Sequence, residues 1–391
     1  MKVKIVYRNY KPLHKAYESL VTNPPEGVQY LVPPVKTGLG KLMPLYRKLR
    51  YFRLGRHIIR VVERIAFSKQ SSDEDIDLYH YLNMISDEVP DKPYIIDFEH
   101  ASSMTGFSYD EDSLDKVYKF ISSEQCISIN CWTKAARRTL EDLLADRYGA
   151  IEQKVNVVYP ALKSMKPADT RPDYKFVKDN AKLKLLFVGT PCYVKGLEEV
   201  LWSIRKINEI YPEKVELYVV SGDAEEICRE YDLPNVKVFE PNFSKQQIVS
   251  LFFAPTDLFV MPTKQDTFGM VFLDALNCGK PVITTKQFAA PEIIDAGTDG
   301  FLVELTNPLL DSVIVPGKED DIKVKSRNLD KTLAKEICDL IEKLIAEKVD
   351  LKKMGANGAK KFIPGEKFSI EVRNKELLDI YKKALEPRPS K

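Results

Sequence analysis

The chain has 391 residues, of which 44% are hydrophobic, so it can form a globular core and is long enough for two domains. Its 59 basic and 57 acidic residues leave a net charge of +2, which gives no reason to expect nucleic acid or another polyanion as a partner. The six cysteines have no C-x-x-C pair and no metal-ligand spacing, so we expect reduced thiols, no bound metal and a cytoplasmic protein.

Short apolar runs rich in β-branched residues alternate with longer helical patterns along the chain. This alternation predicts an α/β fold with parallel sheets. A segment rich in proline and charge, 160–174, is typical of a linker and places a domain boundary near residue 165. We expect strands over 3–7, 94–98, 126–129, 155–159, 183–188, 215–220, 258–261 and 281–284.

The segment 303–330 contains Asn-Pro and Pro-Gly pairs and a run of mixed charges. It is expected to be a surface loop before a helix over 331–347, and we assign it no chemistry.

The most informative stretch follows the predicted strand that ends at Met261. The chain turns through Gly269, continues as a helix, stops at Gly279 and enters another strand at Pro281. The unpaired N–H groups and the positive dipole at the start of this helix favour an anion such as a diphosphate.

Asp274 lies within this helix, which is apolar nearly all round. A buried carboxylate needs a partner, because leaving it alone costs several kcal/mol. A ribose diol can donate two hydroxyl hydrogens to it, as in other Rossmann-type sites. A nearby lysine or backbone group is the alternative partner.

The run Asp266-Thr-Phe-Gly-x4-Asp274-Ala-x2-Cys-Gly-x-Pro-Val resembles the E-x7-E block of family 4 of the retaining glycosyltransferases, with aspartate replacing both glutamates. The resemblance implies that Asp266 contacts the donor sugar and that Asp274 holds the ribose hydroxyls. It also implies that the backbone between them cradles the sugar and the phosphates of the donor, at Thr267, Phe268, Gly269, Met270 and Val271.

The family has the GT-B fold, in which two Rossmann-like domains face a central cleft. The resemblance therefore implies an acceptor-side domain over 1–165 and a domain over 166–369 that binds the nucleotide sugar. It also implies that the carboxyl-terminal helix, 370–391, packs back on the first domain.

A second stretch, 185–196, resembles the family's strand followed by G-R-x4-K-G. After Gly189, Lys195 matches the lysine that neutralises the donor diphosphate, whereas Thr190 replaces the arginine. Weaker resemblances place Gly222 and Glu240, at the ends of two later strands, against the donor nucleotide. A solvated surface charge is the alternative for Lys195.

The amino-terminal half resembles the family less. The usual glycine-rich loop after the first strand is replaced by residues 7–12, whereas 75–80 and 94–100 resemble two central strands. His100 lies where open α/β sheets bind ligands, and the resemblance gives it the family's histidine contact with the donor sugar. A structural histidine is the alternative. Side-chain alternation points Glu99 to the opposite face, away from the site.

Residues 41–69 carry nine basic side chains against one glutamate. This segment resembles an amphipathic helix that lies on anionic lipid, although a solvated face or a basic wall for an anionic acceptor fits as well. No signal peptide and no run of ~18 apolar residues is apparent, so we expect no spanning helix.

These features predict a hexosyltransferase that moves a sugar from UDP- or GDP-sugar to a saccharide, lipid-linked or small-molecule acceptor, without a cofactor. An epimerase or an inverting transferase of the same fold is one alternative. The other is a catalytically silent partner subunit that binds nucleotide sugars, which the departures at Asp266, Asp274 and Thr190 favour.

Overall fold

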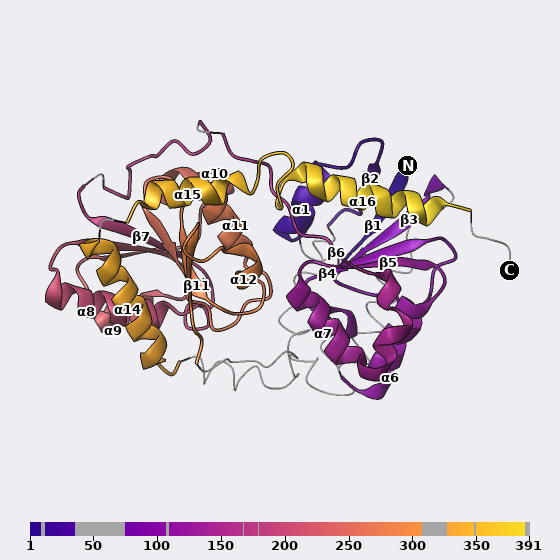
Figure 1. Cartoon of the computed structure of the whole chain (residues 1–391), viewed down its shortest axis with the longest axis horizontal. Coiled ribbons are helices and arrows are strands. Elements are labelled where there is room, and N and C mark those ends of the chain that lie inside the picture. The colour runs from indigo at the N-terminus through magenta and orange to yellow at the C-terminus, as the bar shows by residue number, and fades with distance from the viewer. Residues whose placement is uncertain are drawn as a thin grey trace.

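The computed structural model describes residues 1–8, 12–35, 75–106, 109–166, 168–178, 180–306, 327–347 and 349–387. These residues form two α/β domains, each built on a six-stranded sheet whose neighbouring strands are parallel (Figure 1). Residues 41–69, for which the sequence offers three interpretations, lie outside the described residues, as does most of the predicted loop 303–330.

The first sheet has the strand order β2-β1-β3-β4-β5-β6. Its central strands β3 and β4 are buried along their whole length, as expected for parallel strands covered by helices on both faces. The strands are β1 (Lys2–Val6), β2 (Gln29–Leu31), β3 (Leu78–Leu82), β4 (Tyr94–Phe98), β5 (Cys126–Cys131) and β6 (Val155–Val157). The helices are α1 (Lys15–Thr22), α5 (Ser102–Thr105), α6 (Glu111–Ser122) and α7 (Lys134–Leu144), with 3₁₀ turns at Ala145–Ala150 and Glu152–Lys154.

The second sheet has the order β12-β11-β10-β7-β8-β9. The strands β8 and β9 follow on one side of β7, whereas the later strands β10, β11 and β12 follow on the other side of β7. The strand order therefore reverses between β7 and β10. Its strands are β7 (Leu183–Val188), β8 (Val215–Val220), β9 (Val236–Phe239), β10 (Leu258–Val260), β11 (Val282–Thr285) and β12 (Gly300–Val303). Its helical segments are α8 (Leu197–Ile210), α9 (Glu225–Tyr231), α10 (Lys245–Ile248), a π-helical turn (Val249–Phe253), α11 (Met270–Asn277), α12 (Ala290–Ile293), α14 (Lys331–Ala346) and α15 (Leu351–Lys360).

The last helix, α16 (Ile370–Leu385), leaves the second domain and lies along the first (Figure 1). The hydroxyl of Tyr381, which is fully buried, lies 2.8 Å from His80 Nδ1 and 2.8 Å from the Tyr30 hydroxyl. The Arg373 guanidinium donates to the Asn23 carbonyl at 2.7 Å. Buried polar contacts therefore join the end of the chain to its beginning. The predicted boundary near residue 165 falls between β6 and β7 and stays a prediction.

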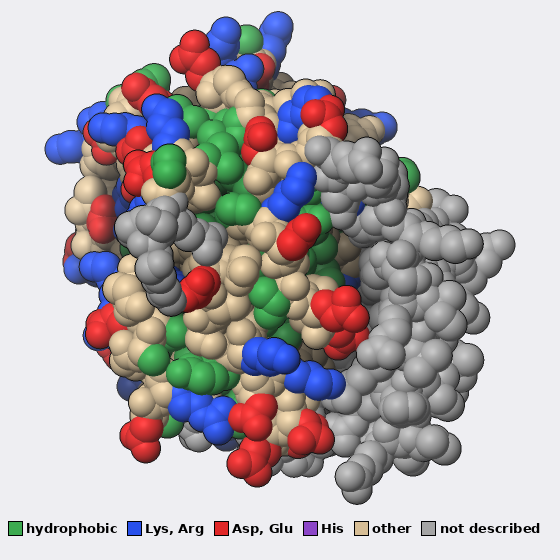
Figure 2. All heavy atoms as spheres, turned by 90° about the vertical axis from the view of Figure 1, so that its right-hand side faces the viewer, with side chains coloured by type: hydrophobic (Ala, Val, Ile, Leu, Met, Phe, Trp, Pro, Cys, Tyr) green, Lys and Arg blue, Asp and Glu red, His purple; other side chains and the backbone are tan. Residues whose placement is uncertain are grey.

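The predicted α/β fold with two parallel sheets is confirmed. The strands predicted over 94–98, 183–188 and 215–220 have the observed bounds, and the others differ by one to three residues at an end. Among the described residues, no helix is long and apolar enough to cross a bilayer. On the first-domain end of the molecule, acidic and basic side chains are interspersed over the described surface (Figure 2).

Candidate active site

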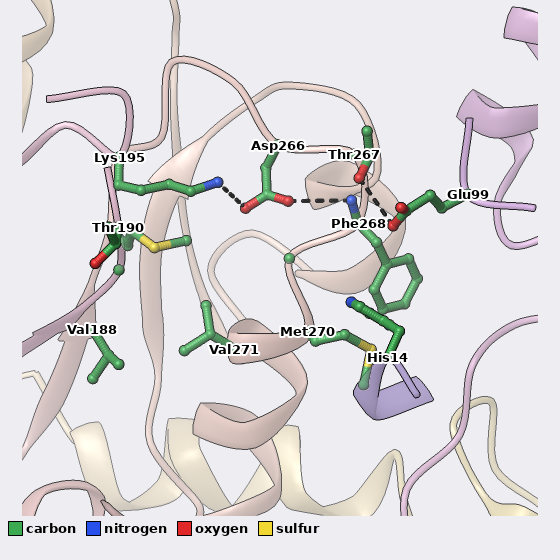
Figure 3. Close-up of a pocket in the computed structure, with 13 residues that line it drawn as sticks. His14, Glu99, Val188, Thr190, Lys195, Asp266, Thr267, Phe268, Met270 and Val271 are labelled. Carbon is green, nitrogen blue, oxygen red and sulfur yellow. Dashed lines mark hydrogen bonds and ion pairs between the residues drawn. The ribbon is translucent and has the colours of Figure 1, made fainter. Parts of the chain in front are cut away.

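A cavity of about 390 Å³ lies between the two domains, beside the carboxyl ends of β7 and β10. This is the point where the strand order reverses, which is where open α/β sheets bind their ligands. The first domain contributes two side chains and the second contributes the rest (Figure 3). The lining residues are His14, Glu99, Val188, Gly189, Thr190, Lys195, Met261, Asp266, Thr267, Phe268, Gly269, Met270 and Val271.

The loop after β10 brings the start of α11 to the cavity wall. Gly269 has φ of +79° and is the N-cap of α11, and a Cβ atom there would lie 2.4 Å from the Phe272 ring. Only glycine fits this position without strain. Met270 and Val271 line the cavity, so the first turn of α11 faces it. That its unpaired N–H groups bind an anion stays a prediction.

Lys195 and Asp266 form an ion pair at one side of this cavity. The Lys195 Nζ atom lies 2.7 Å from Asp266 Oδ2 and donates to the Gln265 carbonyl at 3.0 Å. The loop of Lys195 approaches so closely because Gly196 has φ of +80°, and a Cβ atom there would lie 2.2 Å from the Pro262 carbonyl oxygen. A cation and a carboxylate therefore face the same space.

A buried ion pair fixes the loop that leads to Asp266. Lys264 Nζ lies 2.6 Å from Glu199 Oε1, which also accepts from the Asp330 N–H at 2.9 Å. The backbone N–H of Lys264 donates to the Val194 carbonyl at 2.8 Å, which ties this loop to the one that carries Lys195. Burial raises the pKa of Glu199 above its ordinary value, and the charge of Lys264 opposes this shift.

Glu99 is a cavity residue, and the expectation that it points away from the site is wrong. Its Oε2 atom accepts a hydrogen bond from the Thr267 hydroxyl at 3.2 Å, across the gap between the domains (Figure 3). Burial raises the pKa of Glu99 to about 7; the Thr267 hydrogen bond and the charge of Lys195 oppose this shift, and the charge of Asp266 adds to it.

His100, the neighbour of Glu99, is not among the residues that line the cavity. Its side chain is buried, and its Nδ1 atom accepts from the Ser102 N–H at 3.1 Å. Its ring lies 5.6 Å from the ring of Phe288. Alternation correctly separates the two side chains, but it is Glu99 that lines the cavity. The arrangement of His100 fits the structural alternative, and its contact with a donor sugar stays a prediction.

His14 also lines the cavity, although no sequence pattern indicated this role. The residue caps α1, and its Nδ1 atom accepts from the Ala16 N–H at 3.4 Å. Its ring packs 5.4 Å from the ring of Trp132. Burial lowers the pKa of His14, which leaves the imidazole neutral at pH 7. A neutral ring that accepts at Nδ1 carries its hydrogen on Nε2 and can donate it to a ligand.

Asp274 forms an ion pair with Lys15 of α1. Its partner is thus a lysine, which the sequence analysis gave as the alternative to a ribose. It is not among the lining residues, and its second oxygen, Oδ1, is buried without a hydrogen-bond partner. A buried carboxylate oxygen of this kind can still accept from a hydroxyl. The ribose contact therefore stays a prediction.

The predicted nucleotide contacts Gly222 and Glu240 are exposed and do not line the cavity. The Gly222 N–H donates to the Thr190 hydroxyl at 3.4 Å, and this hydroxyl lies 3.1 Å from that of Ser221. Thr190, which replaces the expected arginine, therefore links the ends of β7 and β8. Among the described residues, no group of three His, Cys, Asp or Glu side chains could hold a metal ion.

Residues 182–312 match the family model described as Glycosyl transferases group 1. This part of the chain is a glycosyl transferases group 1 domain. The domain contains the loops of Lys195 and Asp266 and thus most of the cavity wall.

Two curated relatives each match part of the chain. The N-acetyl-alpha-D-glucosaminyl L-malate synthase of Bacillus anthracis is 29% identical over 134 residues, which are 33% of this chain and 34% of the relative. The D-inositol 3-phosphate glycosyltransferase of Streptomyces bingchenggensis is 26% identical over 219 residues, which are 50% of this chain and 47% of the relative. The chain thus spans between a third and a half of the length of these relatives.

Solved structures match the whole fold. HepE of Anabaena, in complex with UDP and glucose, has a TM-score of 0.62 at 14% identity, and the match covers 98% of this chain and 99% of HepE. Sucrose-phosphate synthase of Thermosynechococcus elongatus has a TM-score of 0.59 at 12% identity, with 98% of each chain covered. The two domains therefore have the GT-B fold, as the sequence predicts.

Proposed function

We propose that this protein transfers a sugar from a nucleoside diphosphate sugar to an acceptor, with the donor bound in the cavity between the domains. The observation that carries the proposal is the meeting of Lys195, Asp266 and the start of α11 in one cavity of a group 1 domain. The names of the curated relatives support a glycosyltransferase, and HepE, which shares the fold, binds UDP and UDP-glucose.

In this proposal the donor diphosphate lies between Lys195 and the first turn of α11. Lys195 has three N–H donors and uses two of them within the protein, for Asp266 and for the Gln265 carbonyl. The third donor and the backbone N–H groups of α11 stabilise the negative charge that develops on the leaving diphosphate, and such fixed donors supply a large share of catalysis.

Asp266 and Asp274 take the two sugars of the donor in the same proposal. The Asp266 carboxylate accepts from hydroxyl groups of the transferred sugar, and the buried Oδ1 atom of Asp274 accepts from the ribose. We further propose transfer with retention at the anomeric carbon, on the basis of the E-x7-E-like block. The stereochemistry of the product tests this and separates an inverting transferase.

The experiment is a binding and turnover screen. UDP, GDP and ADP are titrated by calorimetry, and UDP-glucose, UDP-N-acetylglucosamine, GDP-mannose and ADP-glucose are incubated with the protein, with sugar release followed by NMR. We expect one nucleotide to bind and its sugar to be released, to water or to an acceptor. If no nucleotide binds to the wild-type protein, the proposal is overturned.

A variant series tests the assigned residues. Lys195→Ala should lower turnover by ~10²- to 10³-fold, the usual effect of removing one charge-stabilising donor. Asp274→Ala should weaken nucleotide binding more than Asp266→Ala does, because the ribose belongs to the nucleotide whereas the sugar does not. Equal activity of all three variants contradicts the assignments. Binding without sugar release across a broad acceptor panel favours the silent partner subunit, which the Lys15 ion pair with Asp274 also favours.

A further inference from the structure

His14 lies at the cavity wall, and the first domain holds its ring in place. It is the N-cap of α1, and its Nδ1 atom accepts from the Ala16 N–H at 3.4 Å. Its ring lies 5.4 Å from the ring of Trp132 and 6.3 Å from the ring of Tyr17. Trp132 in turn lies 5.6 Å from the ring of Phe268, in the second domain. These contacts fix the ring of His14 where the two domains meet.

The opposite edge of this ring offers a hydrogen-bond donor to the cavity. Because Nδ1 accepts, the neutral ring carries its hydrogen on Nε2. None of the described residues is a hydrogen-bond partner of this Nε2 atom, and part of the residue is exposed, so a ligand can reach it. In Figure 3 a ring nitrogen of His14 points into the cavity beside Met270, at the first turn of α11. The donor therefore faces the place that the proposed function gives to the diphosphate.

The cavity holds little positive charge for a diphosphate. Among the described residues that line it, Lys195 is the only lysine or arginine, and two of its three donors are used within the protein. Thr190 replaces the arginine of the family motif, and its hydroxyl lies 3.1 Å from that of Ser221. Asp266 and Glu99 also line the cavity, and their negative charges repel a phosphate. A further donor from the first domain offsets part of this repulsion.

We propose that His14 donates a hydrogen bond from Nε2 to the diphosphate of the sugar nucleotide and stabilises it as the leaving group. This inference rests on the proposed function. In the step, the bond from the anomeric carbon to the diphosphate oxygen breaks, and the diphosphate keeps the electron pair. The acceptor oxygen forms the new bond to that carbon, and its proton passes to the diphosphate. His14 keeps its own hydrogen throughout, and a fixed donor of this kind stabilises the charge that develops on the diphosphate.

Two substitutions separate this role from the capping of α1. The amide of asparagine lies where Nδ1 lies in histidine, so His14→Asn keeps a cap for the Ala16 N–H and has no donor at the position of Nε2. The longer side chain of glutamine brings its amide close to the position of Nε2, so His14→Gln keeps a donor and loses the cap. The urea midpoint should therefore fall in His14→Gln and stay unchanged in His14→Asn.

Activity and binding should follow the opposite order. With the sugar nucleotide that the screen above selects, His14→Asn should lower turnover by ~10²-fold, the usual effect of removing one such donor. It should weaken calorimetric affinity for the nucleoside diphosphate by ~10-fold or more, because a hydrogen bond to a charged group is lost. Affinity for the matching nucleoside, which has no phosphate, should stay unchanged. His14→Gln should remain within about tenfold of wild type in both quantities. Asp110→Asn, at the exposed N-cap of α6, is the matched control and should change neither.

A measurement on the wild-type protein needs no variant. The chain has four histidines, so the imidazole nitrogens can be followed by ¹⁵N NMR. The nucleoside diphosphate should shift the Nε2 resonance of His14, and the nucleoside should not. If His14→Asn and His14→Gln do not fold, an Nε2 resonance that ignores the diphosphate overturns the assignment.

The outcomes distinguish this inference from the proposed function. If the wild-type protein binds and cleaves the donor but His14→Asn keeps its turnover and its diphosphate affinity, the assignment is overturned and the proposed function stands. Equal losses of turnover in the two His14 variants would mean a structural role and would also overturn it. If the wild-type protein binds no nucleotide, or binds one and cleaves no donor, both are overturned.

Discussion

Lys264→Met is the substitution whose effect on stability follows most directly from the structure. The pair of Lys264 with Glu199 is almost completely removed from solvent, with side-chain exposures of 3% and 0%. Glu199 Oε1 has Lys264 and the Asp330 N–H as partners, whereas Oε2 has none. Without Lys264, the carboxylate would keep one backbone hydrogen bond and no compensating charge.

Removing one partner of a buried ion pair costs about 3–5 kcal/mol, because the remaining charge stays buried. For a domain of this size that loss lowers the melting temperature by about 6–20 °C. The penalty depends on pH. Loss of Lys264 raises the folded-state pKa of Glu199 further above its unfolded value. The folded variant therefore prefers the protonated acid, so its loss of stability grows as pH rises from 5 to 8.

Tryptophan fluorescence can follow this effect in the second domain alone. The chain has two tryptophans, and in a Trp132→Phe background Trp202 reports on α8, the helix that carries Glu199. Urea titrations at pH 5.5 and pH 8 compare the Lys264→Met variant, the Glu199→Gln variant and the double variant. The double variant should lose less than the two single variants together, because no buried charge then remains. A loss below about 1 kcal/mol at pH 8, or one that shrinks as pH rises, would refute this reasoning.

Two more predictions concern contacts that join distant parts of the chain. Glu292 accepts hydrogen bonds at 2.8 Å from the first two backbone N–H groups of α7, in the other domain. Glu292→Gln should therefore speed hydrogen exchange of these two amides by ~30-fold, which is equivalent to about 2 kcal/mol. Exchange no faster than in the wild type would contradict this prediction. Tyr381→Phe removes the hydroxyl that lies beside His80 Nδ1 and the Tyr30 hydroxyl, and should cost about 1–3 kcal/mol in urea unfolding. Tyr174→Phe, at an exposed tyrosine, should cost nothing measurable.

The fold could be predicted from the sequence because parallel strands are continuous apolar runs. Residues 94–98, 183–188 and 215–220 show this pattern and have the predicted bounds. The prediction missed β2, because its three residues are too few to show a pattern and only one, Leu31, is aliphatic. The segment 75–80 was expected to be a central strand, but β3 begins only at Leu78, after the acidic residues of this segment.

The candidate site could be predicted where its residues lie in one continuous stretch. The turn at Gly269 and the start of α11 follow from local backbone rules, and the structure places Lys195 beside Asp266. His14 and Glu99 could not be found in this way, because only the packing of the two domains brings them to the cavity. The period-two rule for strands also says which side chains share a face but not which face meets the other domain.

The return of α16 to the first domain has a consequence for the order of folding during synthesis. The strands of the first sheet leave the ribosome before the second domain, but the helix that provides Tyr381 and Arg373 leaves after it. Domains at the start of a chain generally fold first during translation. In this protein the first domain can become complete only after the whole second domain has been made, so its uncovered sheet is the surface that a chaperone would have to shield.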